Sequence, residues 1–348
     1  MLELEVSVSK TYKITIAKDF SLFSKRVLPY LSGENVAIIT DDKVDKLYAS
    51  ALGGFLKDKR VIKIVLKHGE KSKNAKNYLS IINALAGNGF TREDSVIAFG
   101  GGVIGDIAGF AASTYMRGIT LVAVPTTLLS MVDSSVGGKT AIDLAAGKNL
   151  CGTFYQPSAV YINTEFLNTL PKKEIKNGLG EVIKYAFLSD TVKKSDIKNI
   201  DENLIYKCLK IKRDIVNEDE KESGVRALLN LGHTCGHAIE KLSGYKLPHG
   251  ACVIKGLLYS IEVSKRLFDL DEKTVKKMYA LLKCGKHDLS SPFPVEDILQ
   301  QIVADKKRQG NSVKFVALKD VGKPETVKIQ LSELKGMLKD YESSVDPV

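Results

Sequence analysis

Short apolar runs, each bounded by Gly, Pro, Asp or Asn, dominate the first half of the chain. The clearest of them are Val36–Thr40, Val61–Leu66, Ser95–Phe99, Ile119–Val124 and Ala159–Ile162. Between some of these runs the apolar residues recur at helical spacing, as in Tyr78–Ala86. An alternation of short buried strands with helices predicts a mostly parallel sheet covered by helices on both faces.

After about Pro171 the apolar residues recur at spacings of three and four, which predicts helices. The predicted helical stretches are Ile175–Phe187, Asn203–Val216, Leu228–Leu242, Cys252–Leu267 and Thr274–Leu282. A strand pair, Val313–Leu318 with Thr326–Ile329, is expected near the C-terminus, turned at Gly322–Pro324. We therefore predict an α/β domain with a Rossmann-like, mostly parallel sheet over residues 1–170 and a mainly α-helical domain over residues 171–348. The active site is expected in the cleft between them.

The composition is that of a soluble globular protein, with 44% apolar and 26% charged residues in a chain of 348. The N-terminus lacks a basic segment followed by an apolar one, and no apolar run approaches the roughly 20 residues that cross a bilayer. We therefore expect a cytoplasmic protein. The five cysteines are odd in number and no pair has Cys-x-x-Cys spacing, which argues against a disulfide framework or a zinc ribbon. Cys235 and Cys252 lie near histidines, where we favour apolar packing over thiolate ligation.

The formal net charge of +10 has two interpretations. One is a surface that binds nucleic acid or membrane, and the other is a lysine-rich exterior with an electropositive pocket for an anionic small molecule. The lysines and arginines are spread along the chain without a basic amphipathic stripe or an interleaved aromatic run. This pattern favours the small anionic ligand, with no nucleic acid and no membrane as partner.

A glycine-rich segment, Gly100–Asp106, follows a predicted strand and opens a helical pattern. Consecutive glycines let the backbone approach a pyrophosphate, and a helix N-terminus adds N–H donors, although a tight turn alone would also explain the glycines. Asp41 closes another predicted strand, where its carboxylate suits ribose hydroxyls, and Thr126 and Thr127 close a third with two hydroxyls. Ligands of parallel sheets bind at the carboxyl ends of strands, so the three groups together favour a dinucleotide.

Histidines are concentrated in the second half of the chain. His233 and His237 are four residues apart on one predicted helical face, and His249 stands at a predicted helix start, so three of the five histidines fall within 17 positions. Glu181 and Lys184 share another helical face. Two imidazoles and one carboxylate suit a catalytic zinc with an open position. The spacing leaves open which histidines are ligands, and structural histidines remain the alternative.

Cationic residues accompany these motifs beside Gly, Asn or His. The set comprises Arg117, Lys139, Lys148, Lys184, Lys212 and Arg226. Any one of them alone is typical of a solvated surface charge. Six of them are more than one anion needs, and the set indicates a substrate that carries both a phosphate and a carboxylate.

Taken together, the motifs resemble those of 3-dehydroquinate synthases, within the sugar-phosphate cyclases. The segments that carry the resemblance are Gly100–Asp106, Ser113–Gly118, Pro125–Ala141, Gly147–Asn149, Gly180–Lys184, Asn230–His233 and Pro248–Gly250. The likeness runs from about Asp41 to Lys307. The stretch Met131–Ala141, together with Arg117, is specific to sugar-phosphate cyclases and is not expected in their polyol-dehydrogenase relatives.

The resemblance implies a divalent metal, Zn2+ or Co2+, held by Glu181, His233 and His249. The NAD contacts that it implies are Asp41, Glu70, Lys73, Gly101, Gly102, Val103, Asp106, Thr126, Thr127, Lys148, Phe166, Thr169 and Leu170. The substrate contacts that it implies are Arg117, Asp133, Lys139, Asn149, Lys184, Lys212, Glu222, Arg226, Asn230, His237 and one of Lys306 and Lys307.

The resemblance also implies a homodimer in which Arg117 reaches the phosphate site of the neighbouring subunit. Two positions depart from the family pattern. Lys43 stands where an adenosine-contacting Asn is common, so that contact is not carried over. Gly180 stands where Ala is common, a difference expected to matter little.

The implied reaction is the conversion of 3-deoxy-D-arabino-heptulosonate 7-phosphate to 3-dehydroquinate and phosphate, in the shikimate pathway. It comprises transient oxidation by NAD, phosphate elimination, re-reduction and an intramolecular aldol closure, so that NAD is regenerated. A metal- and NAD-dependent polyol or glycerol dehydrogenase is the nearest alternative, and would not need Arg117, Lys139, Arg226 and His237 together. Another sugar-phosphate cyclase, making an inosose or a valiolone, is disfavoured by Lys212 and Arg226, since those substrates lack a carboxylate. A basic, non-catalytic binding module would leave Glu181 and the histidines without a purpose.

Overall fold

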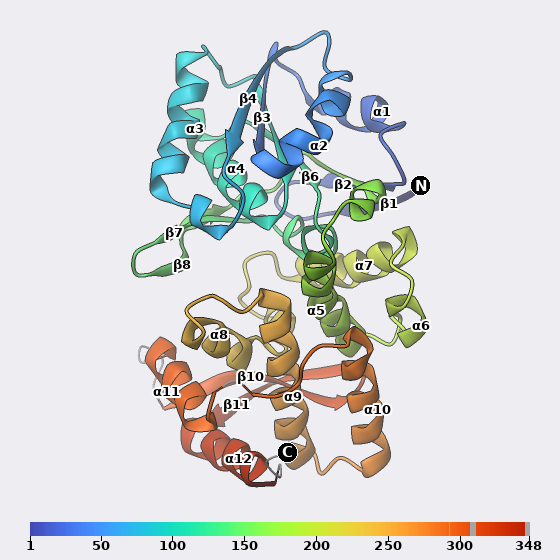
Figure 1. Cartoon of the computed structure of the whole chain (residues 1–348), viewed down its shortest axis with the longest axis vertical. Coiled ribbons are helices and arrows are strands. Elements are labelled where there is room, and N and C mark those ends of the chain that lie inside the picture. The colour runs from blue at the N-terminus through green and yellow to red at the C-terminus, as the bar shows by residue number, and fades with distance from the viewer. Residues whose placement is uncertain (292, 307–310, 345–348) are drawn as a thin grey trace. The chain divides into compact units, whose positions relative to one another are not determined.

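The computed structural model describes residues 1–291, 293–306 and 311–344. The chain divides into two compact units (Figure 1). The α/β unit comprises Met1–Pro171 and Asp201–Lys221, and the helical unit comprises Lys172–Ile200 and the chain from Glu222 onward. The segment Asp201–Lys221, which the sequence pattern placed with the second domain, thus packs with the first. Its helix α7 (Glu202–Glu218) lies against the N-terminal strand, where the side chain of Asn217 accepts the Ser7 N–H at 2.9 Å.

A seven-stranded sheet forms the centre of the α/β unit, in the order β1-β2-β9-β6-β5-β3-β4. The strands are β1 (Leu2–Val6), β2 (Tyr12–Ala17), β3 (Asn35–Asp41), β4 (Arg60–Leu66), β5 (Ser95–Gly100), β6 (Thr120–Pro125) and β9 (Ala159–Asn163). All neighbours pair in parallel except β1 and β2, which form an antiparallel hairpin at one edge. The predicted mostly parallel sheet is confirmed, and the hairpin β1–β2 is an addition.

Helices cover both faces of this sheet. They are α1 (Phe23–Val27), α2 (Asp42–Gly53), α3 (Ala75–Gly87) and α4 (Gly102–Thr114). On one face Ala37, Ile39 and Val96 pack with α3 and α4 in a core of aliphatic residues. On the other face an aromatic cluster around Phe20 and Phe166 fills the space. Because β6, β5 and β3 are neighbouring parallel strands, their carboxyl ends lie side by side at one edge of the sheet.

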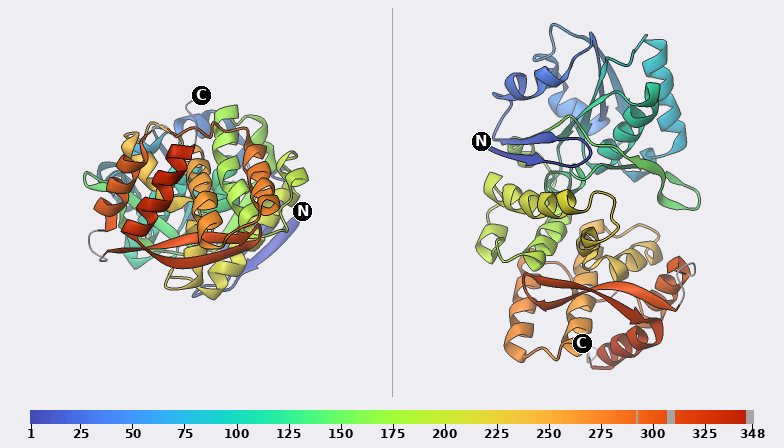
Figure 2. Two further views of the ribbon diagram at one scale, coloured as in Figure 1. Left: turned by 90° about the horizontal axis from the view of Figure 1, so that it is seen from below. Right: turned by 180° about the vertical axis from the view of Figure 1, so that it is seen from behind.

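A second antiparallel hairpin, β7 (Lys139–Leu144) and β8 (Gly147–Phe154), extends from the α/β unit (Figure 2). The sequence pattern did not predict it, because most of β8 is exposed or half-buried and lacks the apolar run of a core strand. Thr140 on its inner side packs beside Gly109 of α4, where an added Cβ would come within 2.5 Å of the threonine methyl group. The hairpin therefore packs against α4 where Thr140 meets Gly109.

The helical unit contains the predicted helices except the one over Asn203–Val216, which is α7 of the α/β unit. Its elements are α5 (Lys172–Leu188), α6 (Lys194–Ile197), α8 (His233–Leu242), α9 (His249–Leu267), α10 (Glu272–Leu282), α11 (Val295–Lys306), β10 (Ser312–Asp320), β11 (Lys323–Gln330) and α12 (Leu331–Ser344). The pair β10–β11 is antiparallel, as predicted, and shares an apolar core with α9, α11 and α12 (Figure 2).

The helix predicted over Leu228–Leu242 is wrong in its first part. A 3-10 turn ends at Asn230, and α8 begins only at His233. Gly232 separates them with a φ of 77°, a left-handed conformation that interrupts a right-handed helix. Other short turns lie at Leu28–Tyr30, Glu70–Ser72, Tyr115–Arg117, Thr164–Asn168 and Lys283–Gly285, with a π turn at Ser130–Ser134.

Glycines allow the helices of this unit to touch backbone to backbone. A Cβ on Gly180 of α5 would lie 2.4 Å from the carbonyl oxygen of Gly250 on α9. A Cβ on Gly256 of α9 would lie 1.7 Å from the carbonyl oxygen of Gly232, just before α8. The expectation that Gly180 matters little is therefore wrong, because the α5–α9 contact has no room for a methyl group. Within the part of the chain described, no helix is long and apolar enough to span a bilayer.

Asp94 ties the start of β3 to the start of β5. Its carboxylate accepts the Asn35 N–H at 2.8 Å and the Thr91 N–H at 2.6 Å, and its side chain is almost fully buried. Burial opposes the charged form, but the hydrogen bonds from Asn35 and Thr91 outweigh it and lower the pKa of Asp94. A depressed carboxyl pKa contributes stability above the unfolded value of about 3.9, and this stability is lost as the pH falls toward the folded value.

Replacing Asp94 by alanine should lower the free energy of unfolding by about 2–4 kcal/mol at pH 7, because buried N–H donors lose their acceptor. The difference from the parent protein should shrink below pH 4. Urea unfolding of both proteins across pH 3–7 measures it. As a control, Asp58→Ala removes an exposed carboxylate of the same unit and should leave the free energy of unfolding nearly unchanged. A deficit that stays constant across this pH range would contradict the assigned role of the charge.

Replacing Gly180 by alanine should lower the free energy of unfolding by about 1–3 kcal/mol, since α5 and α9 must separate to admit the methyl group. The matched control is Gly336→Ala on the exposed side of α12, where nothing lies within 4 Å of the added Cβ. This second change should be neutral or stabilising, because alanine is the better helix former. Thermal unfolding of the two variants distinguishes them, and equal midpoints would disprove the tight contact.

Candidate active site

Three potential metal ligands meet in the helical unit. The Glu181 Oε1 of α5 lies 3.4 Å from His233 Nε2 of α8 and 3.2 Å from His249 Nε2 of α9. One ligand atom from each of the three residues lies within 4.8 Å of the others. Two imidazoles and a carboxylate at this spacing form a set of donors that suits a divalent metal such as zinc with an open coordination position.

The surrounding hydrogen bonds orient both imidazoles. His233 Nδ1 lies 3.0 Å from the carbonyl oxygen of Leu231, and His249 Nδ1 lies 3.3 Å from Glu240 Oε2. Each Nδ1 therefore has an acceptor for its proton, and each Nε2 faces Glu181. This is the usual arrangement around metal-binding histidines, where an outer partner fixes the tautomer and the ring.

Glu181 carries its charge in the interior, with 1% of its surface exposed. Burial raises the pKa of this carboxyl, but Lys184 and the two histidines outweigh burial and hold the pKa well below its usual range. Lys184 forms an ion pair with Glu181 Oε2, and its ammonium lies 4.9 Å from the centre of the Tyr185 ring. In the metal-free chain, burial opposes protonation of His249, but Glu181 and Glu240 raise its pKa to about 10. A metal ion must therefore displace a proton from this ring.

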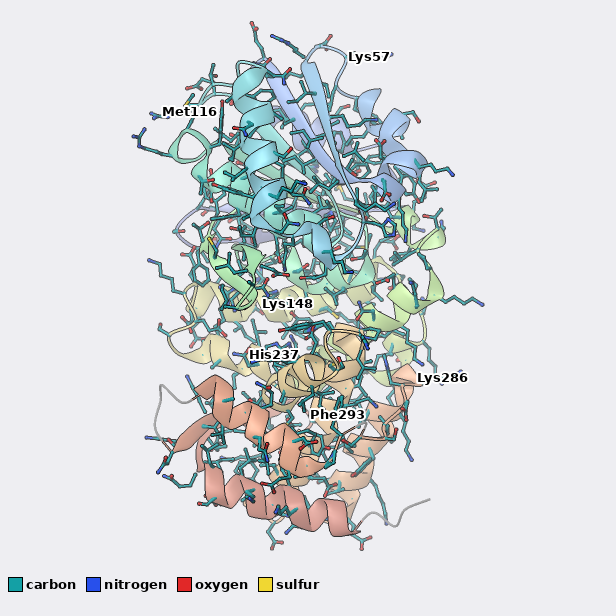
Figure 3. All side chains as sticks on the ribbon, turned by 60° about the vertical axis from the view of Figure 1, so that its left-hand side comes forward. Lys57, Met116, Lys148, His237, Lys286 and Phe293 are labelled. Carbon is teal, nitrogen blue, oxygen red and sulfur yellow. The ribbon has the colours of Figure 1, made fainter. Side chains whose placement is uncertain are left out.

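His237 lies one helical turn beyond His233 on α8, and Figure 3 labels its side chain. The two rings are 5.1 Å apart. Burial, and then the neighbouring His233 and His249, lower the pKa of His237 to about 3. The ring is therefore neutral near pH 7, with one nitrogen able to donate a hydrogen bond and the other able to accept one. Among the described residues, the group that could hold a metal contains His233 and His249 but not His237.

Other predicted substrate contacts of the helical unit precede α8. Arg226 lies in the 3-10 turn Val225–Asn230 and is 2% exposed. The Asn230 side chain donates to Glu222 Oε1 at 2.7 Å, and Glu222 has a left-handed backbone with a φ of 62°.

The last predicted substrate contact is one of two lysines at the end of α11. Lys306 is the final residue of that helix and its side chain is not described, and Lys307 lies outside the described residues.

The predicted nucleotide-binding groups of the α/β unit lie together at the carboxyl ends of neighbouring strands. Gly101, after β5, is the N-cap of α4, and no side chain caps that helix. Thr126 and Thr127 follow β6, and a Cβ on Gly101 would lie 3.0 Å from the Thr127 methyl group. A pocket here is lined by glycine backbone and by Ser134 and Lys139. The uncapped N–H groups and the absence of side chains suit a pyrophosphate.

Lys73 is almost fully buried and collects several predicted contact residues around its ammonium. Its Nζ lies 3.0 Å from Glu70 Oε1 and from Asp106 Oδ2, and 2.6 Å from Asn149 Oδ1. Burial opposes the charge on Lys73, but Asp106 and Glu70 outweigh it and raise the lysine pKa. Burial in turn raises the pKa of Asp106 to about 6, although Lys73 opposes this. Strand β8 therefore meets the helix α4 through one shared cation.

The remaining predicted cations of this unit differ in exposure. Lys212 of α7 is buried and donates to the Asp133 carbonyl oxygen at 2.7 Å, with its carboxylate at 3.0 Å. Lys139 is exposed at the start of β7, and Lys148, labelled in Figure 3, is the second residue of β8. Arg117 has a left-handed backbone with a φ of 66°, beside the exposed Met116.

Two predicted NAD contacts use their side chains elsewhere. The Phe166 ring is buried in the aromatic cluster against Phe99 and Tyr48, so only its backbone is left for a ligand. The Thr169 hydroxyl contacts the Tyr48 hydroxyl, while Leu170 follows in the next turn. Asp41 Oδ1 accepts the N–H groups of Lys43 and Val44 as the N-cap of α2, with Oδ2 remaining for a ribose.

Two polar residues near these groups were not predicted from the sequence. Glu240, which holds His249 Nδ1, follows His237 by three residues on α8, and this helical spacing was the available signal. Asp143 accepts the Asn149 N–H at 2.9 Å and donates its own N–H to the Lys73 carbonyl oxygen at 2.8 Å. No sequence spacing indicated Asp143, because its partner Lys73 is 70 residues away.

Comparison with known proteins identifies the family. Residues 63–177 match the N-terminal region of 3-dehydroquinate synthases, and residues 178–308 match their C-terminal region. The 3-dehydroquinate synthase of Clostridium acetobutylicum is 43% identical over 339 residues, covering 92% of this chain and 94% of the relative. That of Endomicrobium trichonymphae is 39% identical and covers 96% of each chain.

Solved structures share the fold. A 2-deoxy-scyllo-inosose synthase complexed with carbaglucose-6-phosphate, NAD+ and Co2+ has a TM-score of 0.88 at 23% identity, covering 97% of this chain and 99% of its own. A 2-epi-5-epi-valiolone synthase from Streptomyces hygroscopicus with NAD+ and Zn2+ has a TM-score of 0.85 at 23% identity, covering 98% and 99%. An iron-containing alcohol dehydrogenase is more distant, with a TM-score of 0.68 at 14% identity. The match along nearly the whole sequence shows that this chain belongs to the 3-dehydroquinate synthase family.

Proposed function

We propose that this chain is a 3-dehydroquinate synthase, a carbon–oxygen lyase that converts 3-deoxy-D-arabino-heptulosonate 7-phosphate to 3-dehydroquinate and phosphate. The observation that carries the proposal is the group of the buried Glu181 with the partly buried His233 and His249, in a chain 43% identical to a named 3-dehydroquinate synthase. The buried Arg226 of the helical unit agrees with a carboxylate-bearing substrate.

The proposal includes a divalent metal, Zn2+ or Co2+, and NAD, the groups named for the two solved cyclases. Glu181, His233 and His249 would hold the metal. The backbone of Gly101 and Gly102 would face the NAD pyrophosphate. When bound, the metal supplies Lewis-acid polarisation of substrate oxygens and NAD supplies a temporary hydride acceptor.

The chain's own residues would bind and orient the anionic substrate. Lys139 and Asn149 in the α/β unit suit the phosphate, and Arg226 in the helical unit suits the carboxylate. His237 stays neutral near pH 7 and would donate a hydrogen bond to a phosphate oxygen. Such fixed donors lower the barrier by stabilising charge where it develops, without reorganising during the reaction.

Two other reactions fit the residues of the site less well. A polyol or glycerol dehydrogenase would leave the hydride of its substrate on NAD and would not need Lys139, Arg226 and His237 together. A cyclase that makes an inosose or a valiolone acts on a substrate without a carboxylate, which gives the buried Arg226 no partner of that kind.

We further propose that the protein is a homodimer in which Arg117 completes the phosphate site of the partner subunit. Met116, beside it, is 47% exposed and lies at the edge of the α/β unit (Figure 3). Leu150 and Phe154 on the β7–β8 hairpin are exposed as well. Exposed large apolar residues of this kind are typical of a surface that another chain covers.

Incubation of the protein with the heptulosonate phosphate, NAD+ and Zn2+ should release inorganic phosphate without a proportional rise in absorbance of reduced nicotinamide. The reason is that the hydride is borrowed and returned within each turnover. Chelation should abolish turnover, and Zn2+ or Co2+ should restore it. Stoichiometric accumulation of reduced nicotinamide would support the dehydrogenase instead. Full activity in exhaustively metal-stripped protein would overturn the metal assignment alone.

Arg117→Ala should fold and bind NAD and metal but lose most of its turnover. Removing one charge-assisted contact to a buried phosphate costs about 2–4 kcal/mol, or roughly 30- to 1000-fold in a rate or binding constant. Mixing this variant with Lys139→Ala should regenerate activity, because a heterodimer holds one site that retains both cations. Subunit exchange is verified with two differently tagged chains. If exchange occurs and the mixture is no more active than its parts, Arg117 does not act in the partner's site.

A further inference from the structure

Helix α9 begins without a cap from its own segment. Pro248 occupies the N-cap position, and its side chain offers no acceptor to the first turn. The Ala251 and Cys252 N–H groups bond to the Pro248 carbonyl oxygen at 3.0 and 3.1 Å, whereas the Gly250 N–H has no carbonyl partner within the helix and needs an acceptor from outside it. His249, the first residue of α9, belongs to the metal-ligand group, so the order of this turn determines where its imidazole lies.

The missing cap comes from another helix. Asn177 of α5 accepts the Gly250 N–H on its Oδ1 at 2.7 Å, across 73 residues of sequence. Its Nδ2 lies 3.5 Å from Glu174 Oε2, which fixes the orientation of the amide. Asn177 stands four residues before Glu181, one turn along α5. A single side chain therefore links the turn that begins with His249 to the helix that carries Glu181.

The backbones of the two helices are in contact at the same point. A Cβ on Gly250 would lie 1.9 Å from the Asn177 carbonyl oxygen, so the amide side chain reaches Gly250 without a gap for water. The imidazole of His249 is held from the opposite side by Glu240 of α8. Glu240 orients the ring, whereas Asn177 holds the backbone from which the ring projects.

We propose that Asn177 is a positioning residue of the metal site, which caps α9 from α5 and thereby keeps His249 Nε2 beside Glu181. This inference rests on the metal assignment of the proposed function. Its physical basis is that first turns of helices fray when their N–H groups lack acceptors, and a fraying first turn would carry His249 away from Glu181. The structural consequence is a loss of preorganisation at one ligand while the other two stay in place.

Asn177→Ala in the full-length, metal-stripped protein should weaken Zn2+ and Co2+ binding by about tenfold or more, as for the loss of other partners that orient metal ligands. Calorimetry gives the dissociation constants, and the visible absorption of bound Co2+ reports the ligand geometry independently of activity. Asn177→Asp restores an acceptor oxygen and is made together with Glu174→Gln, so that two carboxylates do not face each other. This pair of changes should recover most of the affinity and the spectrum, whereas Glu174→Gln alone should alter neither.

Asp271→Ala is the matched control. Asp271 accepts the Thr274 N–H at 2.7 Å as the N-cap of α10 in the same unit, so its loss removes a cap of the same kind from a helix without a ligand. It should lower the melting temperature to a similar extent and leave metal affinity unchanged. If both variants weaken metal binding equally, the effect is general destabilisation and the proposal is wrong.

The outcomes separate this inference from the proposed function. If the parent protein binds no metal, or binds it equally after Glu181→Ala, the metal assignment itself fails. If the parent binds metal and Asn177→Ala binds it with the same affinity and spectrum, the role of Asn177 is overturned. Should Asn177→Ala not fold, amide hydrogen exchange of Gly250 in the metal-free parent decides. Slow exchange supports the cap from α5, and exchange at the rate of a free helix N-terminus refutes it.

Discussion

The charge of Glu181, buried on α5, is the constraint around which the helical unit is built. A carboxylate removed from water costs several kcal/mol unless partners surround it, so the chain must bring donors to it. Lys184 comes from the same helix, whereas the imidazoles come from the first residues of α8 and α9. Gly180 and Gly250 let the backbones of α5 and α9 touch, and Gly232 and Gly256 do the same where α8 begins beside α9, so the charge and the glycines belong to one arrangement.

The α/β unit also buries a charge, here the positive charge of Lys73. Lys73 is buried among the carboxylates of Glu70, Asp106 and Asp143, so the negative groups outnumber the cation that joins them. The raised pKa of Asp106 is a consequence, since burial of this carboxyl is only partly offset by Lys73. The same cluster holds the β7–β8 hairpin against α4 through Asp143 and Asn149. Strand β8 of this hairpin buries little apolar surface, so charge and hydrogen bonds hold the hairpin in place. A strand in the core is held by apolar packing instead.

These two clusters show what a sequence can and cannot predict. The parallel strands were predicted because continuous apolar runs are typical of strands buried on both faces, and Glu181 with Lys184 because helical spacing fixes their face. The β1–β2 and β7–β8 hairpins were missed because their edge strands β1 and β8 lack the continuous apolar runs of strands that are buried on both faces. The start of α8 was misplaced because apolar periodicity continues through Gly232, where a left-handed backbone ends it. Asn177, Glu240 and Asp143 act on partners that are close only in the folded chain, so no local pattern reveals them.

The same physical logic relates the fold to the chemistry. Iron-containing alcohol dehydrogenases share the architecture, so the fold alone does not determine the reaction. Each unit of this chain nevertheless holds buried cations, Lys184 and Arg226 in the helical unit and Lys212 in the α/β unit, all at most 5% exposed. Burying them reduces stability, because each loses water that its protein partners replace imperfectly. Cations fixed in this way stabilise negative charge more strongly than flexible surface lysines can, because they need not reorganise when the charge develops.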